Sequence, residues 1–216
     1  MNDFSKDSEF SKTELFRTFQ KEPLGFIDIG SLGDVHQLIH PIASLVHAVC
    51  FELNESGCEE LRQKYKNDRI FAQLSIVQAA LFSRVSKQKL YITNVPTNTS
   101  ILEPNRDFIK RYQADKFAVK EVGSVSTRTL DSIIYGKNLS GKTMGEFIKL
   151  DTQGSEYDIL RGAKRVLKER CLGVWCEVEF FEVYRKQKTF SDIDSLLKKY
   201  GLFLYGIYPH YRSTKS

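Results

Sequence analysis

Residues 25–34 read GFIDIGSLGD, and this stretch decides the fold. An apolar run that ends in Gly30 and Gly33 is typical of a buried strand that leaves a sheet through a glycine turn, where a ligand can approach the backbone closely. The spacing of these glycines lacks the G-x-G-x-x-G pattern of dinucleotide-binding turns. The stretch therefore predicts the first strand of an open α/β sheet, with either a ligand-binding or a purely structural turn at its carboxyl end.

Further apolar runs follow at regular intervals and alternate with segments of helical pattern. The segment at residues 56–67 begins with Ser56 and Glu59 in capping-box spacing, which marks a helix start. This alternation predicts a Rossmann-like α/β fold, with a mostly parallel sheet, helices on both faces and an antiparallel C-terminal strand at residues 202–208. The remaining strands are expected at residues 47–53, 75–83, 146–151 and 172–180, and the remaining helices at residues 35–46, 155–169 and 191–200. Pro41 is expected to kink the helix at residues 35–46 or to restrict it to a short first turn.

The middle of the chain departs from this alternation. Residues 89–93 and 117–130 read as β segments, and the stretch between them, NVPTNTSILEPN at residues 94–105, is rich in proline and asparagine. This composition predicts a surface loop, and its length points to a functional role. We expect a tail and a short helix over residues 1–20, followed by one domain over residues 21–216.

The composition is that of a soluble globular protein, with 41% hydrophobic and 27% charged residues in a chain of 216. Because no apolar run approaches the roughly 20 residues that span a bilayer, and the N-terminus is polar, we expect no integral membrane segment and a cytoplasmic location. The net charge of +5 is spread along the chain, which argues against a nucleic-acid partner. The four cysteines form no C-x-x-C pair and have no histidine at metal-ligand spacing, so we expect reduced thiols.

An acid ends the second predicted strand. Glu52 lies about twenty residues beyond the glycine turn, which is the spacing at which a carboxylate accepts hydrogen bonds from the two hydroxyls of a ribose. A solvated acid at the end of a strand is the structural alternative. Together with Asp28 and Gly30 in the first turn, Glu52 favours a nucleoside-binding edge.

A second acidic turn follows the strand at residues 146–151, within KLDTQGSE at residues 149–156. Asp151 stands at the end of the strand, and Glu156 begins the next helix, where a carboxylate favours the positive end of the helix dipole. Because Asp151 would lie at the same edge as the first turn, we interpret it as a candidate for handling protons or a metal ion.

Two further acids, Glu177 and Glu179, lie two residues apart near the end of VWCEVEF at residues 174–180. Residues with this spacing face the same side of a strand. Glu179 is nearer the carboxyl end and is the better candidate for the site. An ion pair with Lys149 or another base is the structural alternative.

These residues, in this order, resemble the FkbM methyltransferase family from about residue 25 to about residue 208. The most specific portion reads TLD at residues 129–131, FIKLDTQGSE at 147–156 and LRGA at 160–163, and it is similar to the family signature "TLD … IKIDVQGAE … LRGA". SILEPN at residues 100–105 and the region around residues 178–193 also resemble the family.

The resemblance implies a class I methyltransferase fold that binds S-adenosylmethionine and methylates oxygen, commonly a hydroxyl of a sugar, a glycolipid or a related metabolite. A small molecule or glycan is then the acceptor, Asp151 is the first candidate for the catalytic base, and Glu179 is the second. A divalent metal at Asp151 is left open. The resemblance places Asp28, Gly30 and Gly33 on the methionine side of the cofactor, Glu52 on its ribose, and Ala80 and Leu81 near its adenine.

Two other functions stay open at this stage. A nicotinamide-dependent oxidoreductase would use the same fold, but the missing G-x-G-x-x-G disfavours it. A non-catalytic binding or scaffold domain is the other alternative. Its support is the turn Gly30-Ser31-Leu32-Gly33-Asp34, where the family usually shows G-A-x-x-G.

Overall fold

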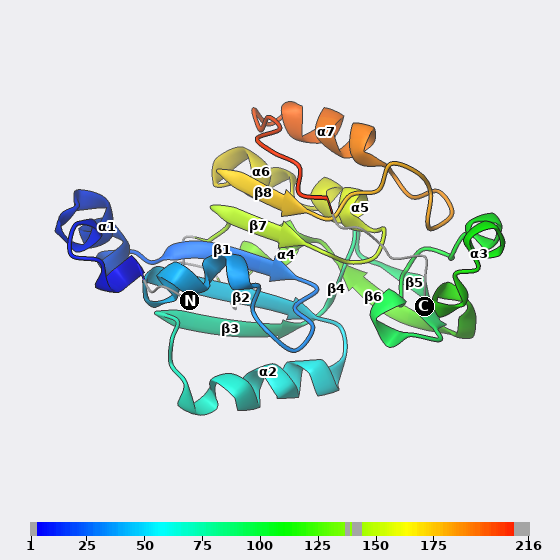
Figure 1. The fold of residues 1–216 in the computed structure, drawn as a ribbon, viewed down its shortest axis with the longest axis horizontal. Helices are drawn as coiled ribbons and strands as arrows, with labels where there is room; N and C mark the ends of the chain where they lie inside the picture. The colour runs from blue at the N-terminus through cyan, green and yellow to red at the C-terminus, as the bar shows by residue number, and fades with distance from the viewer. Residues whose placement is uncertain (1–3, 137–138, 140–143, 210–216) are drawn as a thin grey trace.

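The computed structural model describes residues 4–136, 139 and 144–209, and it contains two sheets (Figure 1). The larger sheet has five parallel strands in the order β3-β2-β1-β7-β8. This arrangement confirms the predicted Rossmann-like α/β fold class. The strands are β1 (Leu24–Ile29), β2 (Val46–Glu52), β3 (Gln73–Gln78), β7 (Phe147–Leu150) and β8 (Gly173–Cys176).

Helices cover both faces of the parallel sheet, so the central strands β1 and β2 are buried along their whole length. One face carries Ile27 and Phe51 against α4 (Leu130–Ile134), α5 (Glu156–Arg161), α6 (Lys164–Glu169) and α7 (Phe190–Lys198). The other face carries Phe26 and Ala48 against the 3-10 segment η3 (Gln37–Leu45) and α2 (Glu55–Asn67). Strands that are buried on both faces read as continuous apolar runs, which is why the sequence reveals them.

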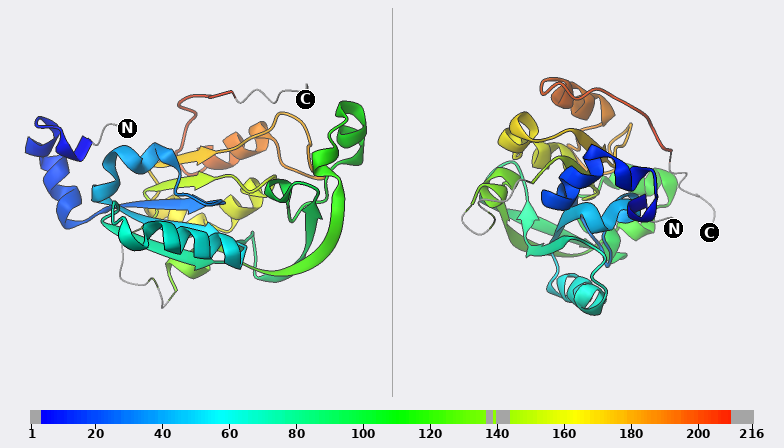
Figure 2. Two further views of the ribbon diagram at one scale, coloured as in Figure 1. Left: turned by 60° about the horizontal axis from the view of Figure 1, so that its bottom comes forward. Right: turned by 90° about the vertical axis from the view of Figure 1, so that its left-hand side faces the viewer.

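The middle of the chain forms a separate three-stranded sheet in the order β4-β6-β5, with β4 (Ala80–Leu81), β5 (Ser86–Thr93) and β6 (Val119–Arg128). Strands β5 and β6 run antiparallel, and β4 runs parallel to β6. Figure 1 and the left view of Figure 2 show this sheet and α3 (Arg106–Tyr112) beyond the carboxyl ends of the parallel strands. The loop at residues 94–105 is therefore carried to the edge where a ligand is expected.

The N-terminal segment lies at the opposite end, beside the amino ends of the parallel strands (Figure 1). It consists of two 3-10 turns, η1 (Phe4–Lys6) and η2 (Phe10–Lys12), followed by α1 (Glu14–Lys21). The hydroxyl of Thr13 accepts a hydrogen bond from the backbone N–H of Phe16 and caps this helix. Within the part of the chain that the structure describes, no helix is both long and apolar enough to cross a membrane.

The predicted helix at residues 155–169 forms as two short helices, α5 and α6, which meet at Gly162. A Cβ atom at Gly162 would lie 2.4 Å from the backbone oxygen of Phe82, so the chain passes too close to another segment for any other residue. The carboxylate of Asp131 accepts hydrogen bonds from the backbone N–H groups of Arg165 and Val166 and caps α6. The TLD and LRGA parts of the signature therefore hold this corner of the fold together.

Two predicted elements differ in the structure. Residues 202–208 form no strand: they pair with no other described strand, and Phe203 and Tyr205 are 74% and 100% exposed. The apolar pattern is present, but the segment has no hydrogen-bonded strand partner among the described residues, so the expected antiparallel strand is wrong. The expected helix at residues 35–46 is the 3-10 segment η3 rather than an α-helix, and its bend at Ile42, just after Pro41, agrees with the kink expected from the proline.

Candidate functional site at the switch point of the parallel sheet

The turns after β1 and β7 meet at the point where the strand order reverses, since β1 lies between β2 and β7. The backbone N–H of Asp151 donates to the carbonyl of Ile29 (3.1 Å). Gly30 has a φ of +82°, and a Cβ atom there would lie 2.0 Å from the carbonyl oxygen of Asp151. Gly30 is thus required for the two turns to touch. Gly33 also has a positive φ of +72°, and a Cβ atom there would meet Glu60 Oε2 at 3.8 Å, an ordinary contact distance. Ligands of open α/β sheets bind at this position.

Asp28 is buried within β1 and forms an ion pair with Lys149 on the neighbouring strand. Its Oδ1 lies 3.1 Å from Lys149 Nζ, and its Oδ2 accepts a hydrogen bond from the backbone N–H of His36 (2.7 Å). Lys149 Nζ also donates to the carbonyl of Gly30 (3.0 Å). The pair therefore holds the β1 turn to β7 and to the start of η3.

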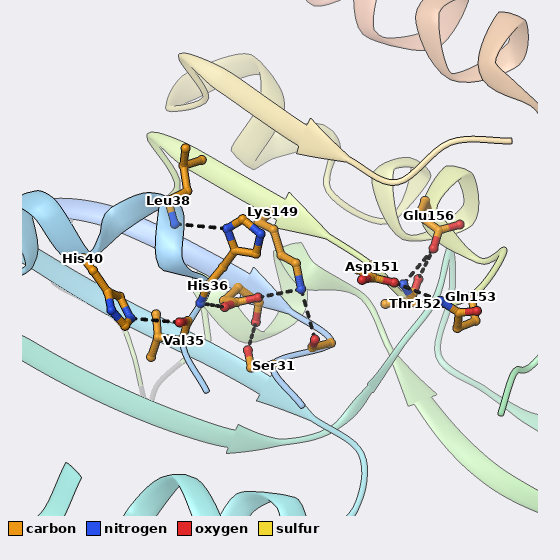
Figure 3. A network of polar contacts seen from close by, with 12 residues as sticks. Ser31, Val35, His36, Leu38, His40, Lys149, Asp151, Thr152, Gln153 and Glu156 are labelled. Atoms are coloured by element: carbon orange, nitrogen blue, oxygen red, sulfur yellow. Dashed lines mark hydrogen bonds and ion pairs between the residues drawn. The ribbon is translucent and has the colours of Figure 1, made fainter. Parts of the chain in front are cut away.

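His36 lies next to this ion pair and packs against the aromatic ring of Trp175 on β8, with ring centroids 6.0 Å apart. Tyr208 stacks on Trp175 at 5.0 Å. The Nδ1 of His36 accepts from the backbone N–H of Leu38 (Figure 3). Burial, reinforced by the positive charge of Lys149, lowers the pKa of His36 below its ordinary value. His36 therefore loses its proton at a lower pH than a free imidazole does.

Glu52 ends β2, as the sequence predicts, and it packs against the first turn of α2. Its Oε1 accepts a hydrogen bond from the backbone N–H of Asn54 (2.8 Å). A Cβ atom at Gly57 would lie 2.9 Å from Glu52 Cγ, so the glycine makes room for this side chain. Ala80 and Leu81 form β4, just after the end of β3, and both are buried. Their contact with an adenine stays a prediction.

The carboxylate of Asp151 is exposed and follows directly on the last residue of β7. Gln153 Nε2 donates to Asp151 Oδ1 (3.0 Å) and to Glu177 Oε2 (3.1 Å), and so connects two carboxylates from different turns. The buried Tyr184 places its hydroxyl 3.2 Å from Gln153 Oε1. The hydroxyl of Ser100 donates to the carbonyl of Gln153 (2.7 Å). Two segments far from this turn in the sequence, one at Ser100 and one at residues 177–184, therefore converge on it.

Glu156 stabilises the same turn from inside (Figure 3). Its Oε1 accepts from the backbone N–H groups of Thr152 (2.7 Å) and Gly154 (3.2 Å), and from the hydroxyl of Thr152. Burial raises the pKa of Glu156 above its ordinary value, although these hydrogen bonds act in the opposite direction. The acid that the sequence places at the start of a helix thus holds the turn on which Asp151 stands.

Glu177 and Glu179 lie beyond the end of β8, because that strand stops at Cys176 opposite the last residue of β7. The two acids are therefore not neighbours on one strand face. Glu177 contacts Gln153 at the site, whereas Glu179 accepts a hydrogen bond through its backbone carbonyl from Phe190 N–H (2.9 Å). A catalytic role of Glu179 stays a prediction.

Sequence reasoning missed Gln153, Tyr184 and Ser100 as members of the site. Gln153 stands inside the signature at residues 147–156, and Ser100 begins SILEPN, so their places in the motifs were the available signal. Their mutual contacts depend on the tertiary structure. Among the described residues, no group of three or more His, Cys, Asp or Glu side chains is arranged to hold a metal ion.

Comparison with known proteins gives one result for this architecture. The family model of the methyltransferase FkbM domain matches residues 42–203, which include β2, the three-stranded sheet and the turn after β7. No curated protein and no solved structure shows a significant match to the chain.

Proposed function

Because the chain belongs to the FkbM methyltransferase family, we propose that it transfers the methyl group of S-adenosylmethionine to a hydroxyl oxygen of a sugar, a glycolipid or a related metabolite. The observation that carries the proposal is the switch point, where the β1 and β7 turns meet with Asp151 exposed. Glu52 stands at the end of the adjacent strand. An acid for the ribose and an acid for the acceptor would then lie at one edge of the sheet.

The residues at this edge fit the cofactor. Glu52 uses Oε1 for Asn54, and its second oxygen is our candidate acceptor for the ribose hydroxyls. Gly33 leaves its part of the β1 turn without a side chain, so a ligand can approach the backbone. Asp28 and Gly30 contribute by shaping the turn, since one is buried and the other packs against Asp151. When bound, S-adenosylmethionine supplies an electrophilic methyl group on a sulfonium.

The acceptor hydroxyl must lose its proton as its oxygen forms the new bond to carbon. We assign the proton to Asp151, because its exposed carboxylate lies on a turn that Glu156 and Ser100 hold in place. Glu177 shares the amide of Gln153 with Asp151 and is the second carboxylate at this position. Most of the rate acceleration would come from holding the acceptor oxygen in line with the methyl group.

Calorimetric titration with S-adenosylmethionine tests the proposal. Glu52→Ala removes the candidate ribose acceptor, and we expect it to weaken binding about 10- to 100-fold, the usual cost of losing a hydrogen bond to a charged group. Glu59→Ala is the matched control, because this glutamate lies on the exposed surface of α2 and pairs only with residues of that helix. Its affinity should equal that of the wild type.

The same titration separates the alternatives. A folded wild-type protein that takes up no S-adenosylmethionine at millimolar concentration would contradict the proposal and favour a non-catalytic domain. Heat from NAD in its place would indicate an oxidoreductase. Equal affinity of wild type and Glu52→Ala would keep the cofactor but remove Glu52 from the ribose site.

A further inference from the structure

We propose that Gln153 is a positioning residue, which holds the carboxylates of Asp151 and Glu177 in a fixed arrangement through one shared amide group. The inference rests on the proposed methyl transfer, because the role that it assigns to Gln153 is to orient Asp151 toward the acceptor hydroxyl. Gln153 Nε2 lies 3.0 Å from Asp151 Oδ1 and 3.1 Å from Glu177 Oε2. A primary amide has two N–H bonds, so each carboxylate receives one of them.

The orientation of the amide follows from its partners. In one orientation the two N–H bonds face the two carboxylates, and the oxygen faces the hydroxyl of Tyr184, whose one proton is shared between this oxygen (3.2 Å) and the carbonyl of Asn98 (3.0 Å). The flipped amide would place its oxygen against both carboxylates. The arrangement therefore favours one orientation of the amide, in which both acids accept a hydrogen bond from it.

The backbone of Gln153 is held as firmly as its side chain. Its φ is +59°, a left-handed conformation that non-glycine residues rarely adopt, and Gly154 follows with a φ of +101°. Ser100 Oγ donates to the carbonyl of Gln153, and a Cβ atom at Gly154 would lie 2.8 Å from the ring of Tyr184. A strained residue that its surroundings hold in place from several sides is typical of a functional site.

The shared amide would keep the exposed carboxylate of Asp151 in one position. Asp151 is exposed, and among the described residues Gln153 is the one side chain that donates a hydrogen bond to its carboxylate. Two neighbouring carboxylates repel each other, so without the amide Asp151 would turn toward solvent. Loss of the amide should therefore lower the rate of methyl transfer and leave cofactor binding at β1 and β2 unchanged.

The kinetic test compares wild type, Gln153→Leu and Tyr184→Phe, with tritium-labelled S-adenosylmethionine and a panel of methyl and octyl glycosides as acceptors. We expect kcat to fall about tenfold or more in Gln153→Leu and less in Tyr184→Phe, which loses one hydroxyl on the amide. The KM for S-adenosylmethionine and its affinity by calorimetry should stay within about twofold of wild type. Gln63→Leu is the control, because Gln63 donates its amide to a carboxylate, Glu59, on the surface of α2.

An NMR measurement tests the contact without an acceptor. The two side-chain amide protons of Gln153 are identified by their disappearance in Gln153→Leu. We expect Asp151→Asn and Glu177→Gln each to shift these signals, because each variant replaces one of the two charged acceptors.

The outcomes separate this inference from the proposed function. Amide signals that respond to neither variant would overturn the inference, and so would an unchanged kcat in Gln153→Leu. A parallel loss of kcat, cofactor affinity and melting temperature would reduce Gln153 to a structural role. A wild type that binds no S-adenosylmethionine would overturn the proposed function itself, whatever the amide signals show.

Discussion

Asp28 and Asp151 are both acids near the carboxyl ends of neighbouring parallel strands, yet their surroundings are opposite. Asp28 lies inside β1, has no exposed surface and contacts Lys149 and the backbone of His36. Asp151 lies one residue past the end of β7 and is exposed. A carboxylate within a strand of the sheet forms an ion pair that holds two strands together, whereas a carboxylate just beyond the end of a strand is exposed and can contact a ligand.

The largest expected effect concerns the buried ion pair of Asp28 and Lys149. Asp28→Asn leaves Lys149 buried without its counter-charge, and breaking a buried pair in this way costs about 3–5 kcal/mol. We expect urea unfolding to show a free energy of unfolding lower by this amount. Replacement of both partners, as in Asp28→Asn with Lys149→Met, should recover part of the loss because no unpaired charge stays buried.

Equal stability of the single and double variants would contradict this account of the pair. The double variant also separates a structural role of Asp28 from a role in the reaction such as the one proposed for Asp151. If it folds and still binds S-adenosylmethionine, Asp28 acts on the site only by holding the β1 turn.

The next effect concerns the exposed acid. Asp151→Asn keeps the shape of the side chain but removes the base, and we expect methyl transfer to slow on the order of 100-fold. Because Asp151 is exposed, the free energy of unfolding should change by no more than about 0.5 kcal/mol. The measurements are initial rates with labelled S-adenosylmethionine and urea unfolding of the same preparation. A stable variant with wild-type rates would remove Asp151 from the reaction.

The smallest effect concerns Glu156, the buried acid next to Asp151. Burial raises its pKa above the ordinary value of 4.5, so the folded protein retains a proton that the unfolded chain releases. The stability from Glu156 is thus present below pH 4.5 and is lost as the pH rises through the folded pKa, by at most about 1.4 kcal/mol per pH unit. The free energy of unfolding of Glu156→Gln should not show this decrease with pH when unfolding is measured from below pH 4.5 upward. Parallel pH curves for variant and wild type would contradict the assignment.

The parallel sheet could be predicted from the sequence because its central strands, β1 and β2, are buried on both faces. These strands are mostly apolar, and the glycine turns and helix starts that follow them mark their boundaries. The break at Gly162 could not be predicted, since it depends on the approach of Phe82, eighty residues away. The pattern at residues 202–208 predicts a strand, but a strand also needs a partner in register.

The sequence predicts which turns form the site, but not which side chains contact each other there. Asp151 and Glu52 end their strands as expected, because the end of an apolar run is visible in the sequence. The choice between Glu177 and Glu179 depends on where β8 stops, and β8 stops where its partner β7 ends. The sequence of β8 alone contains no information about the length of β7.

Trp175 is the single tryptophan of the chain, and its indole contacts the rings of His36 and Tyr208. The protein therefore has an optical probe of its own beside the β1 turn. Because His36 packs against the indole, we expect the fluorescence of Trp175 to respond when this imidazole gains or loses a proton. A ligand that moves the start of η3 would change that emission without any label attached to the protein.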